Sequence, residues 1–174
     1  MKTIDIIGKN YFGHWTKTRT ACRAIVVKDG SILLSYETKT DQWQLPGGGV
    51  EAGENEKTCC IRETAEETGV LAEPSECFLE IDEYYEDFKW VNRYFVCRET
   101  GTTEMHLTAR EKAVGMEPRR IPTEEAMRIF ASHPLYDGTD EMRRGMYLRE
   151  YRALCTLTEM GLLPSAKQTE DDPS

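Results

Sequence analysis

Residues 48–70 read GGVEAGENEKTCCIRETAEETGV, and this stretch is the basis of our fold prediction. Residues 56–68 fit a helix in which Asn55 is the N-cap and Glu56 lies at the positive end of the helix dipole. Gly69 supplies the left-handed residue that commonly ends a helix. Three glycines at 47–49 precede the expected helix. Glycine lets the backbone approach a ligand or a metal closely. We therefore expect a glycine-rich loop that presents a helix.

The expected helix carries three carboxylates on one face, because Glu63, Glu66 and Glu67 follow an i, i+3, i+4 spacing. Like charges at this spacing destabilise a helix by roughly 0.2–0.5 kcal/mol per pair. Arg62 projects about 100° round the helix from Glu63, and Lys57 is almost two turns away, so we expect neither to neutralise the cluster well. A hard divalent cation such as Mg²⁺ would neutralise it, since Mg²⁺ prefers carboxylate, carbonyl and water oxygens.

An acidic helix face can also be an ordinary solvated surface, and the helix alone favours that interpretation. Two neighbouring features favour a metal site over a solvated surface. One is the glycine-rich turn just upstream, and the other is an opposite face with Ile61 and Ala65, which we expect to pack the helix down.

The spacing of these residues resembles the signature of the Nudix hydrolase family, G-x5-E-x7-R-E-U-x-E-E-x-G-U, where U is a bulky aliphatic residue. Eight of the nine specified positions agree, namely Gly48, Glu54, Arg62, Glu63, Glu66, Glu67, Gly69 and Val70. The departure is Thr64, which we expect to point toward the sheet and to pack with its methyl group.

The resemblance implies roles for the acidic residues. Glu66 and Glu67 are metal ligands, Glu63 is either a ligand or the base that activates water, and the carbonyl of Gly47 is a further ligand. The three glutamates are thus the implied catalytic residues. The implied cofactor is Mg²⁺, with Mn²⁺ as an alternative.

The same resemblance implies structural roles for other residues of the signature. Arg62 pairs with Glu54 and holds the loop against the helix, while Gly48 and Gly69 shape the loop and the helix end. The implied fold is α/β, an α/β/α sandwich around a mixed β-sheet. The implied reaction is hydrolysis of a diphosphate linkage in a small-molecule nucleotide: a nucleoside triphosphate, a nucleotide sugar, ADP-ribose or a dinucleoside polyphosphate.

Residues outside the signature must supply the substrate contacts. Trp43 either lines the substrate site or belongs to the core, and we favour the core. Arg19 and Arg23 either meet a phosphate group or lie on a solvated strand edge, and we favour the edge. Glu111, with Glu104 as the alternative, is a candidate acid from a distal loop, or else an ordinary surface acid.

The remaining sequence predicts strands on both sides of this helix. A hairpin is expected at Asp29-Gly30, and Thr123 is expected to cap a helix that ends near residue 133. Residues 1–19 either pair with the sheet or cover one end of it. The predicted strands cover 20–28, 31–36, 43–45, 77–85 and 90–98, a loop covers 101–120, the last helix covers 139–160, and residues 165–174 form a disordered tail.

Composition bounds the class of protein. The chain has 174 residues, 39% of them hydrophobic and 30% charged, which suits a single globular domain over residues 1–164. No apolar run approaches the roughly 20 residues needed to span a bilayer, so we expect a cytoplasmic protein without membrane contact. Six cysteines without a CxxC pair suit a reducing compartment, and adjacent Cys59 and Cys60 are expected to be small core or boundary residues.

The net charge is −9 and is unevenly distributed. Residues 1–28 carry +5, so the remainder carries −14. Nucleic acid is therefore an unlikely partner, because binding to it depends on cations that neutralise phosphates. A protein this acidic needs another source of positive charge to handle phosphates, and a bound metal would supply it.

Other function classes stay open at this point. The first is a non-catalytic Nudix-like domain that binds nucleotides or regulates, although such domains typically lack the carboxylates kept here. The others are a fold relative such as an isoprenoid diphosphate isomerase, and an acidic metal-binding interaction protein. The resemblance also implies a possible homodimer, formed through residues 1–19.

Overall fold

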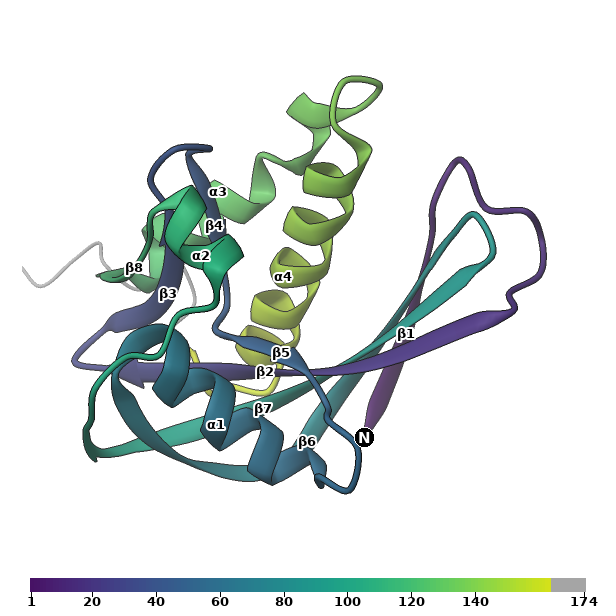
Figure 1. The fold of residues 1–174 in the computed structure, drawn as a ribbon. Helices are drawn as coiled ribbons and strands as arrows, with labels where there is room; N and C mark the ends of the chain where they lie inside the picture. The colour runs from purple at the N-terminus through teal and green to yellow at the C-terminus, as the bar shows by residue number, and fades with distance from the viewer. Residues whose placement is uncertain (164–174) are drawn as a thin grey trace, which may run out of the picture.

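The computed structural model describes residues 1–163, and the tail predicted for residues 165–174 lies outside them. Strands dominate the first two thirds, and the C-terminal third is mainly helical (Figure 1). The strands are β1 (Lys2–Ile7), β2 (Lys17–Lys28), β3 (Ser31–Glu37), β4 (Gln42–Gln44), β5 (Gly47–Gly49), β6 (Val70–Tyr85), β7 (Phe88–Thr102) and β8 (Met116–Pro122). The helices are α1 (Glu56–Thr68), α2 (Ala109–Val114), α3 (Thr123–Ala131), α4 (Glu141–Glu159) and the short 3-10 helix η1 (His133–Tyr136).

The strands form a mixed sheet in the order β1-β6-β7-β2-β3-β4, with β5 paired to β2 and β8 paired to β3. β1 runs parallel to β6 and β2 parallel to β7, whereas the other pairs are antiparallel. The predicted hairpin between β2 and β3 is confirmed. Asp29 and Gly30 both adopt positive φ, 51° and 73°, as a two-residue hairpin turn requires.

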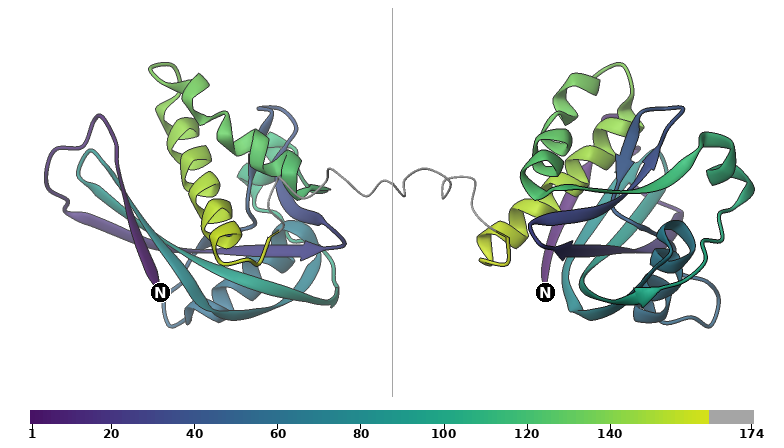
Figure 2. Two further views of the ribbon diagram at one scale, coloured as in Figure 1. Left: turned by 180° about the vertical axis from the view of Figure 1, so that it is seen from behind. Right: turned by 90° about the vertical axis from the view of Figure 1, so that its left-hand side faces the viewer.

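Helices cover both faces of this sheet, so the predicted α/β/α arrangement is confirmed (Figure 2). Successive residues of a strand point to opposite faces. On β2, Ala24 therefore packs in the cluster beneath α1, while Ile25 packs in the cluster beneath α3 and α4. Cys59 and Cys60 lie on the face of α1 that packs against the sheet and are buried, as expected of small core residues.

Of residues 1–19, for which two arrangements were expected, residues 2–7 and 17–19 pair with the sheet as strands. β1 adds to the edge of β6, and the first residues of β2 pair with the first residues of β7. The outer ends of β1, β2, β6 and β7 extend past the helices as an arm (Figures 1 and 2). No helix in residues 1–163 is long and apolar enough to cross a membrane.

Several predicted boundaries were wrong. Residues 101–120 are not a plain loop, because β7 continues to Thr102 and the segment contains α2 and most of β8. The cap of α3 is Pro122 and not Thr123, whose amide and hydroxyl both donate to the carbonyl of Gly30 instead. The last helix begins at Glu141, two residues later than predicted, because the Asp140 side chain caps it by accepting from the Arg143 amide.

Candidate active site

The central helix forms where its local signals predict. α1 covers Glu56–Thr68, and the Asn55 side chain accepts a hydrogen bond from the Thr58 amide at 2.9 Å. Gly69 ends the helix with φ 69°, and its amide donates to the carbonyl of Ala65. These contacts satisfy backbone groups that a helix end leaves unpaired, and they fix where the acidic residues lie.

The face that packs α1 against the sheet differs from our expectation. Ile61 is 40% exposed and Ala65 is half-buried, whereas Cys59, Cys60 and Thr64 are buried. Small side chains let the helix approach the sheet closely, so the packing face is built from cysteine and threonine rather than from isoleucine. The Thr64 hydroxyl donates to the Cys60 carbonyl at 2.7 Å, which satisfies it inside the helix.

Glu67 is the most buried of the three acidic residues, at 3% exposed. Its Oε2 accepts from the Ser35 hydroxyl at 2.8 Å and from the Gly47 amide at 3.2 Å. Burial raises the pKa of Glu67 from 4.5 to about 8, although the hydrogen bond from Ser35 opposes the rise. A carboxylate held in this way is poorly compensated by the protein alone.

Glu63 packs against the glycine-rich loop. A Cβ added to Gly48 would lie 2.5 Å from the Glu63 carboxyl atoms, so any larger residue there would displace this carboxylate. Burial raises the pKa of Glu63, while the nearby Arg62 acts in the opposite direction. Glu66, one turn from Arg62, is less buried than Glu67.

Arg62 contacts two of the three acidic residues, although we expected it to neutralise the cluster poorly. Its Nη1 donates to Glu63 Oε1 at 2.8 Å and to Glu66 Oε2 at 3.2 Å. The side chain is long enough to bend back over the helix, which the 100° separation of the Cβ vectors does not prevent. Its Nε and Nη2 also bind Glu54, at 2.8 and 2.9 Å, which is the pair that the resemblance implied. The Arg62 guanidinium holds the pKa of Glu54 at about 2.

Gly47 lies against β2 so closely that an added Cβ would overlap the Cys22 carbonyl. Its own carbonyl accepts from Arg23 Nη1 at 2.9 Å. Arg23 is therefore half-buried and turned into the site, and the solvated strand edge that we favoured is wrong for it. Its buried Nε has no hydrogen-bond partner among the described residues.

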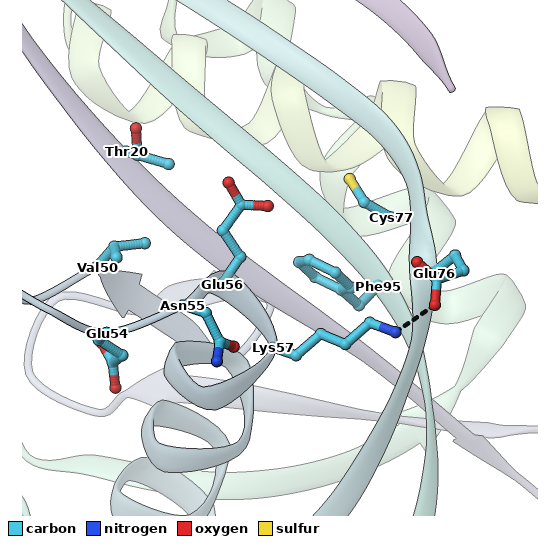
Figure 3. Close-up of a pocket in the computed structure, with 9 residues that line it drawn as sticks. All are labelled: Thr20, Val50, Glu54, Asn55, Glu56, Lys57, Glu76, Cys77 and Phe95. Carbon is cyan, nitrogen blue, oxygen red and sulfur yellow. Dashed lines mark hydrogen bonds and ion pairs between the residues drawn. The ribbon is translucent and has the colours of Figure 1, made fainter.

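A cavity of about 410 Å³ brings these groups together. Glu63, Glu66 and Glu67 line it together with Gly47, Gly48 and four arginines, Arg19, Arg23, Arg62 and Arg110. A second cavity, of about 490 Å³, lies at the start of α1 and is drawn in Figure 3. It contains the Lys57–Glu76 ion pair but none of the three acidic residues above, so the smaller cavity is the candidate active site.

The other predicted contact residues fall differently. Trp43 does not line this cavity; its ring contacts the Tyr36 ring in a tilted arrangement, with 4.2 Å between centroids, and packs against the main core. Glu111 lines the cavity, but its carboxylate accepts from the Thr108 amide at 2.8 Å as part of the capping box of α2. Glu104 is exposed and lies outside the cavity lining.

Sequence reasoning missed three residues that belong to the site. Ser35 supplies a hydroxyl to Glu67, while Gln44 and Arg110 line the cavity. No local pattern marks them, because each reaches the cavity through strand pairing or through the loop after β7. Only their polar character in otherwise apolar surroundings, as for Ser35 within the run ILLSY, was a usable signal.

The donor set fits a hard divalent cation. Glu63 and Glu66 already share one cationic Nη1 of Arg62, so their oxygens can face a common positive charge. Glu67 is a buried carboxylate with a raised pKa, as expected of an acid that lacks a cation. In the described conformation, however, no three acidic, histidine or cysteine side chains of residues 1–163 converge tightly enough to form a complete metal site.

Comparison with known proteins adds the family. RNA pyrophosphohydrolase from Dinoroseobacter shibae is 36% identical over 67 residues, which is 36% of this chain and 42% of that protein. The m7GpppN-mRNA hydrolase of Saccharomyces cerevisiae is 34% identical over 62 residues, or 36% of this chain and 6% of that protein. The match thus spans less than half the length of these curated relatives.

Solved structures show the same fold at lower identity. A NUDIX hydrolase from Nitrosomonas europaea has a TM-score of 0.61 at 16% identity, covering 90% of this chain and 98% of that one. The E. coli ORF135 protein has a TM-score of 0.57 at 20% identity, covering 89% and 96%. The NUDIX domain family model matches residues 17–144. Because that match covers well over half of the sequence and includes the whole acidic segment, the chain belongs to the Nudix hydrolase family.

Proposed function

We propose that this protein hydrolyses a diphosphate linkage in a nucleoside diphosphate derivative, with Mg²⁺ or Mn²⁺ as cofactor. The observation that carries the proposal is the single cavity in which Glu63, Glu66 and Glu67 face arginine side chains. A cavity of about 410 Å³ falls within the range of small-molecule sites.

Glu66, Glu67 and the carbonyl of Gly47 would hold the cation, and Glu63 would act either as a further ligand or as the base. Glu67 supports this role, because its buried carboxylate has a pKa of about 8 in the protein alone and a bound cation would favour its charged form. When bound, the cation would offset charge on the phosphoryl oxygens and acidify the attacking water. The Arg23 guanidinium occupies one lone pair of the Gly47 carbonyl and leaves the second lone pair available.

The chain's own residues then have distinct tasks. Glu63, whose pKa is raised by burial, is suited to collect the proton from the attacking water at its carboxylate. Arg23 lines the cavity, so its guanidinium can attract a phosphoryl oxygen by its charge. Arg62 holds the loop to the helix through Glu54 and keeps the acids in place.

The proposal is tested with a substrate panel in Mg²⁺, in Mn²⁺ and in EDTA. The panel contains nucleoside triphosphates, nucleotide sugars, ADP-ribose and dinucleoside polyphosphates. Capped and 5′-triphosphorylated RNA are included because the curated relatives are named for RNA. We expect metal-dependent release of a nucleoside monophosphate, of pyrophosphate or of phosphate from at least one class.

Glu67→Gln should nearly abolish this turnover, since it removes one negative ligand from the metal site. The matched control is Glu76→Gln, which makes the same chemical change at an exposed side chain of the other cavity. Full activity of Glu67→Gln would contradict the assigned metal role. Tight nucleotide binding in a calorimeter without any turnover would support the non-catalytic alternative instead. The cytoplasmic location, the homodimer and the low affinity for nucleic acid stay predictions from the sequence.

A further inference from the structure

Arg19 differs from the other arginines that line the candidate active site. Arg23 donates to the Gly47 carbonyl, Arg62 binds its glutamates, and Arg110 donates to Glu37. Within residues 1–163, by contrast, the Arg19 side chain is exposed on β2, as we favoured, and makes no hydrogen bond or ion pair, although it lines the cavity. A guanidinium has five N–H donors and is always charged, so an unused one in a cavity is a ready site for an anion.

The Arg19 guanidinium is held in place by its neighbours rather than by acceptors. A Cβ added to Gly49 would lie 2.6 Å from Arg19 Nε, so the guanidinium lies directly against the glycine backbone. On β7, the register partner of Arg19 is Trp90, and the Arg19 Cζ lies 5.8 Å from the centre of its ring. Phe88 stacks on Trp90 at 4.3 Å with an interplanar angle of 19°. Cation–π contact with an aromatic pair orients the guanidinium without using its N–H groups.

The strand β5 separates Arg19 from the carboxylates. A Cβ added to Gly48 would collide with the Glu63 carboxylate, whereas a Cβ added to Gly49 would collide with the Arg19 guanidinium. Adjacent strand residues point to opposite faces, so the two side chains flank β5 from opposite sides. Both side chains nevertheless line one cavity, together with the three glycines of β5. An anion at Arg19 is therefore a different part of the ligand from the group next to Glu63.

We propose that Arg19 binds a phosphate beyond the scissile diphosphate, so that the site is built for polyphosphate chains of three or more phosphates. Trp90 is the positioning residue for Arg19. This inference rests on the proposed function for the identity of the scissile linkage. It extends that proposal by naming the substrate class, which nucleoside triphosphates, dinucleoside polyphosphates and 5′-triphosphorylated RNA share.

The charge balance of the chain supports the assignment. With a net charge of −9, the protein repels a polyphosphate at long range. The cations that face the cavity therefore decide how many phosphate groups of the ligand are bound. A planar guanidinium can bind two phosphate oxygens at once, which a lysine ammonium does less specifically.

The first test measures binding by isothermal titration calorimetry in Mg²⁺, a readout that does not depend on the tryptophan residues. The probes are inorganic tripolyphosphate and inorganic pyrophosphate. Arg19→Ala should weaken tripolyphosphate binding by about 10- to 100-fold, the usual effect of a lost hydrogen bond to a charged group, and leave pyrophosphate binding unchanged. Lys17→Ala is the matched control, because Lys17 is an exposed cation on the same strand that pairs with Asp87 and lies outside the cavity lining.

Two further variants separate position from charge. Gly49→Ala keeps every charge but places a methyl group where the Arg19 guanidinium now lies, so it should weaken tripolyphosphate binding as well. Trp90→Leu should weaken it by about 2- to 5-fold, the value of an exposed cation–π contact. It should have no additional effect in the Arg19→Ala background, because the two residues act through one guanidinium.

The second test compares turnover. Arg19→Ala should raise KM for a nucleoside triphosphate, a dinucleoside tetraphosphate or a 5′-triphosphorylated RNA, and leave kcat nearly unchanged. It should leave KM for a two-phosphate nucleotide sugar unchanged. The relative effect on the three long-chain substrates identifies which of them reaches Arg19.

Two results would overturn the inference: unchanged tripolyphosphate affinity in Arg19→Ala, or an equal loss in Lys17→Ala. Failure of the proposed function gives a different result. In that case no substrate is turned over by the wild-type protein, while tripolyphosphate binding still reports on Arg19.

Discussion

Replacing Glu67 by glutamine should stabilise the metal-free protein even though it removes the proposed activity. Glu67 is 3% exposed, and burial raises its pKa from 4.5 to about 8. At pH 7 the folded protein must either keep a proton on this acid or bury its charge, and the pKa difference corresponds to about 3 kcal/mol. Glutamine avoids this cost, because it is neutral and its carbonyl can still accept from Ser35 and Gly47.

The pH dependence gives the prediction a definite sign. Since the pKa of Glu67 is higher in the folded protein, the folded state binds its proton more tightly than the unfolded chain does. The stability that this proton confers is complete below pH 4.5 and is lost progressively as the pH rises toward about 8. The free energy of unfolding of Glu67→Gln should therefore exceed that of the wild type least near pH 4.5. The difference should grow by about 1.4 kcal/mol per pH unit above that value.

The assay is urea unfolding in EDTA at several pH values between 4.5 and 8, followed by the same series in Mg²⁺. Mg²⁺ should stabilise the wild type, by about 2.7 kcal/mol at a hundred times its dissociation constant, and should stabilise Glu67→Gln much less. Glu76→Gln, at an exposed side chain, should match the wild type throughout. The reasoning is refuted if Glu67→Gln is the less stable protein in EDTA at pH 7, or if the difference does not change with pH.

Three further substitutions test the framework around the site by urea unfolding. Asn55→Ala removes the side-chain cap of α1 and should cost about 1 kcal/mol; an unchanged midpoint would show that the cap contributes nothing. Arg149→Leu leaves Glu83 and Glu150 without their buried partner, bonded now at 2.8 and 3.0 Å, and should cost about 3–5 kcal/mol. Thr64→Val loses only a bond inside α1, so stability should change by less than about 1.5 kcal/mol. Its turnover should equal that of the wild type, which a separate activity assay checks.

The parts of the fold that the sequence predicts well are those set by neighbouring residues. The ends of α1 follow from Asn55 and Gly69, whose effects act within one helical turn. The turn between β2 and β3 follows from Asp29 and Gly30, which accept positive φ at low cost. In both cases the energy that decides the conformation comes from atoms a few residues apart, so a single sequence contains the information.

The errors have a common physical origin in packing partners that the sequence does not identify. The apolar side chain of Ile61 predicts a buried position, but the buried face of α1 is formed by other residues, including Cys60 and Thr64, and Ile61 lies outside it. The sequence of β8, MEPRRIP, contains two prolines and two arginines, which disfavour a strand. It becomes a strand because β3 offers it an antiparallel partner, with Leu33 opposite Arg120 and Leu34 opposite Arg119.

The candidate site shows the same division between local and distant information. The signature residues on α1 could be placed from their spacing, but the cations opposite them could not, because β5 consists of three glycines that no propensity marks as a strand. Pairing of β5 with β2 puts Gly47 opposite Arg23 and thereby turns an arginine from an expected strand edge into the cavity. The buried Arg23 Nε then lacks an acceptor among the described residues, which is unfavourable for the protein alone. The same pairing places the positive charge of Arg23 on the wall of the cavity that the acidic helix also lines.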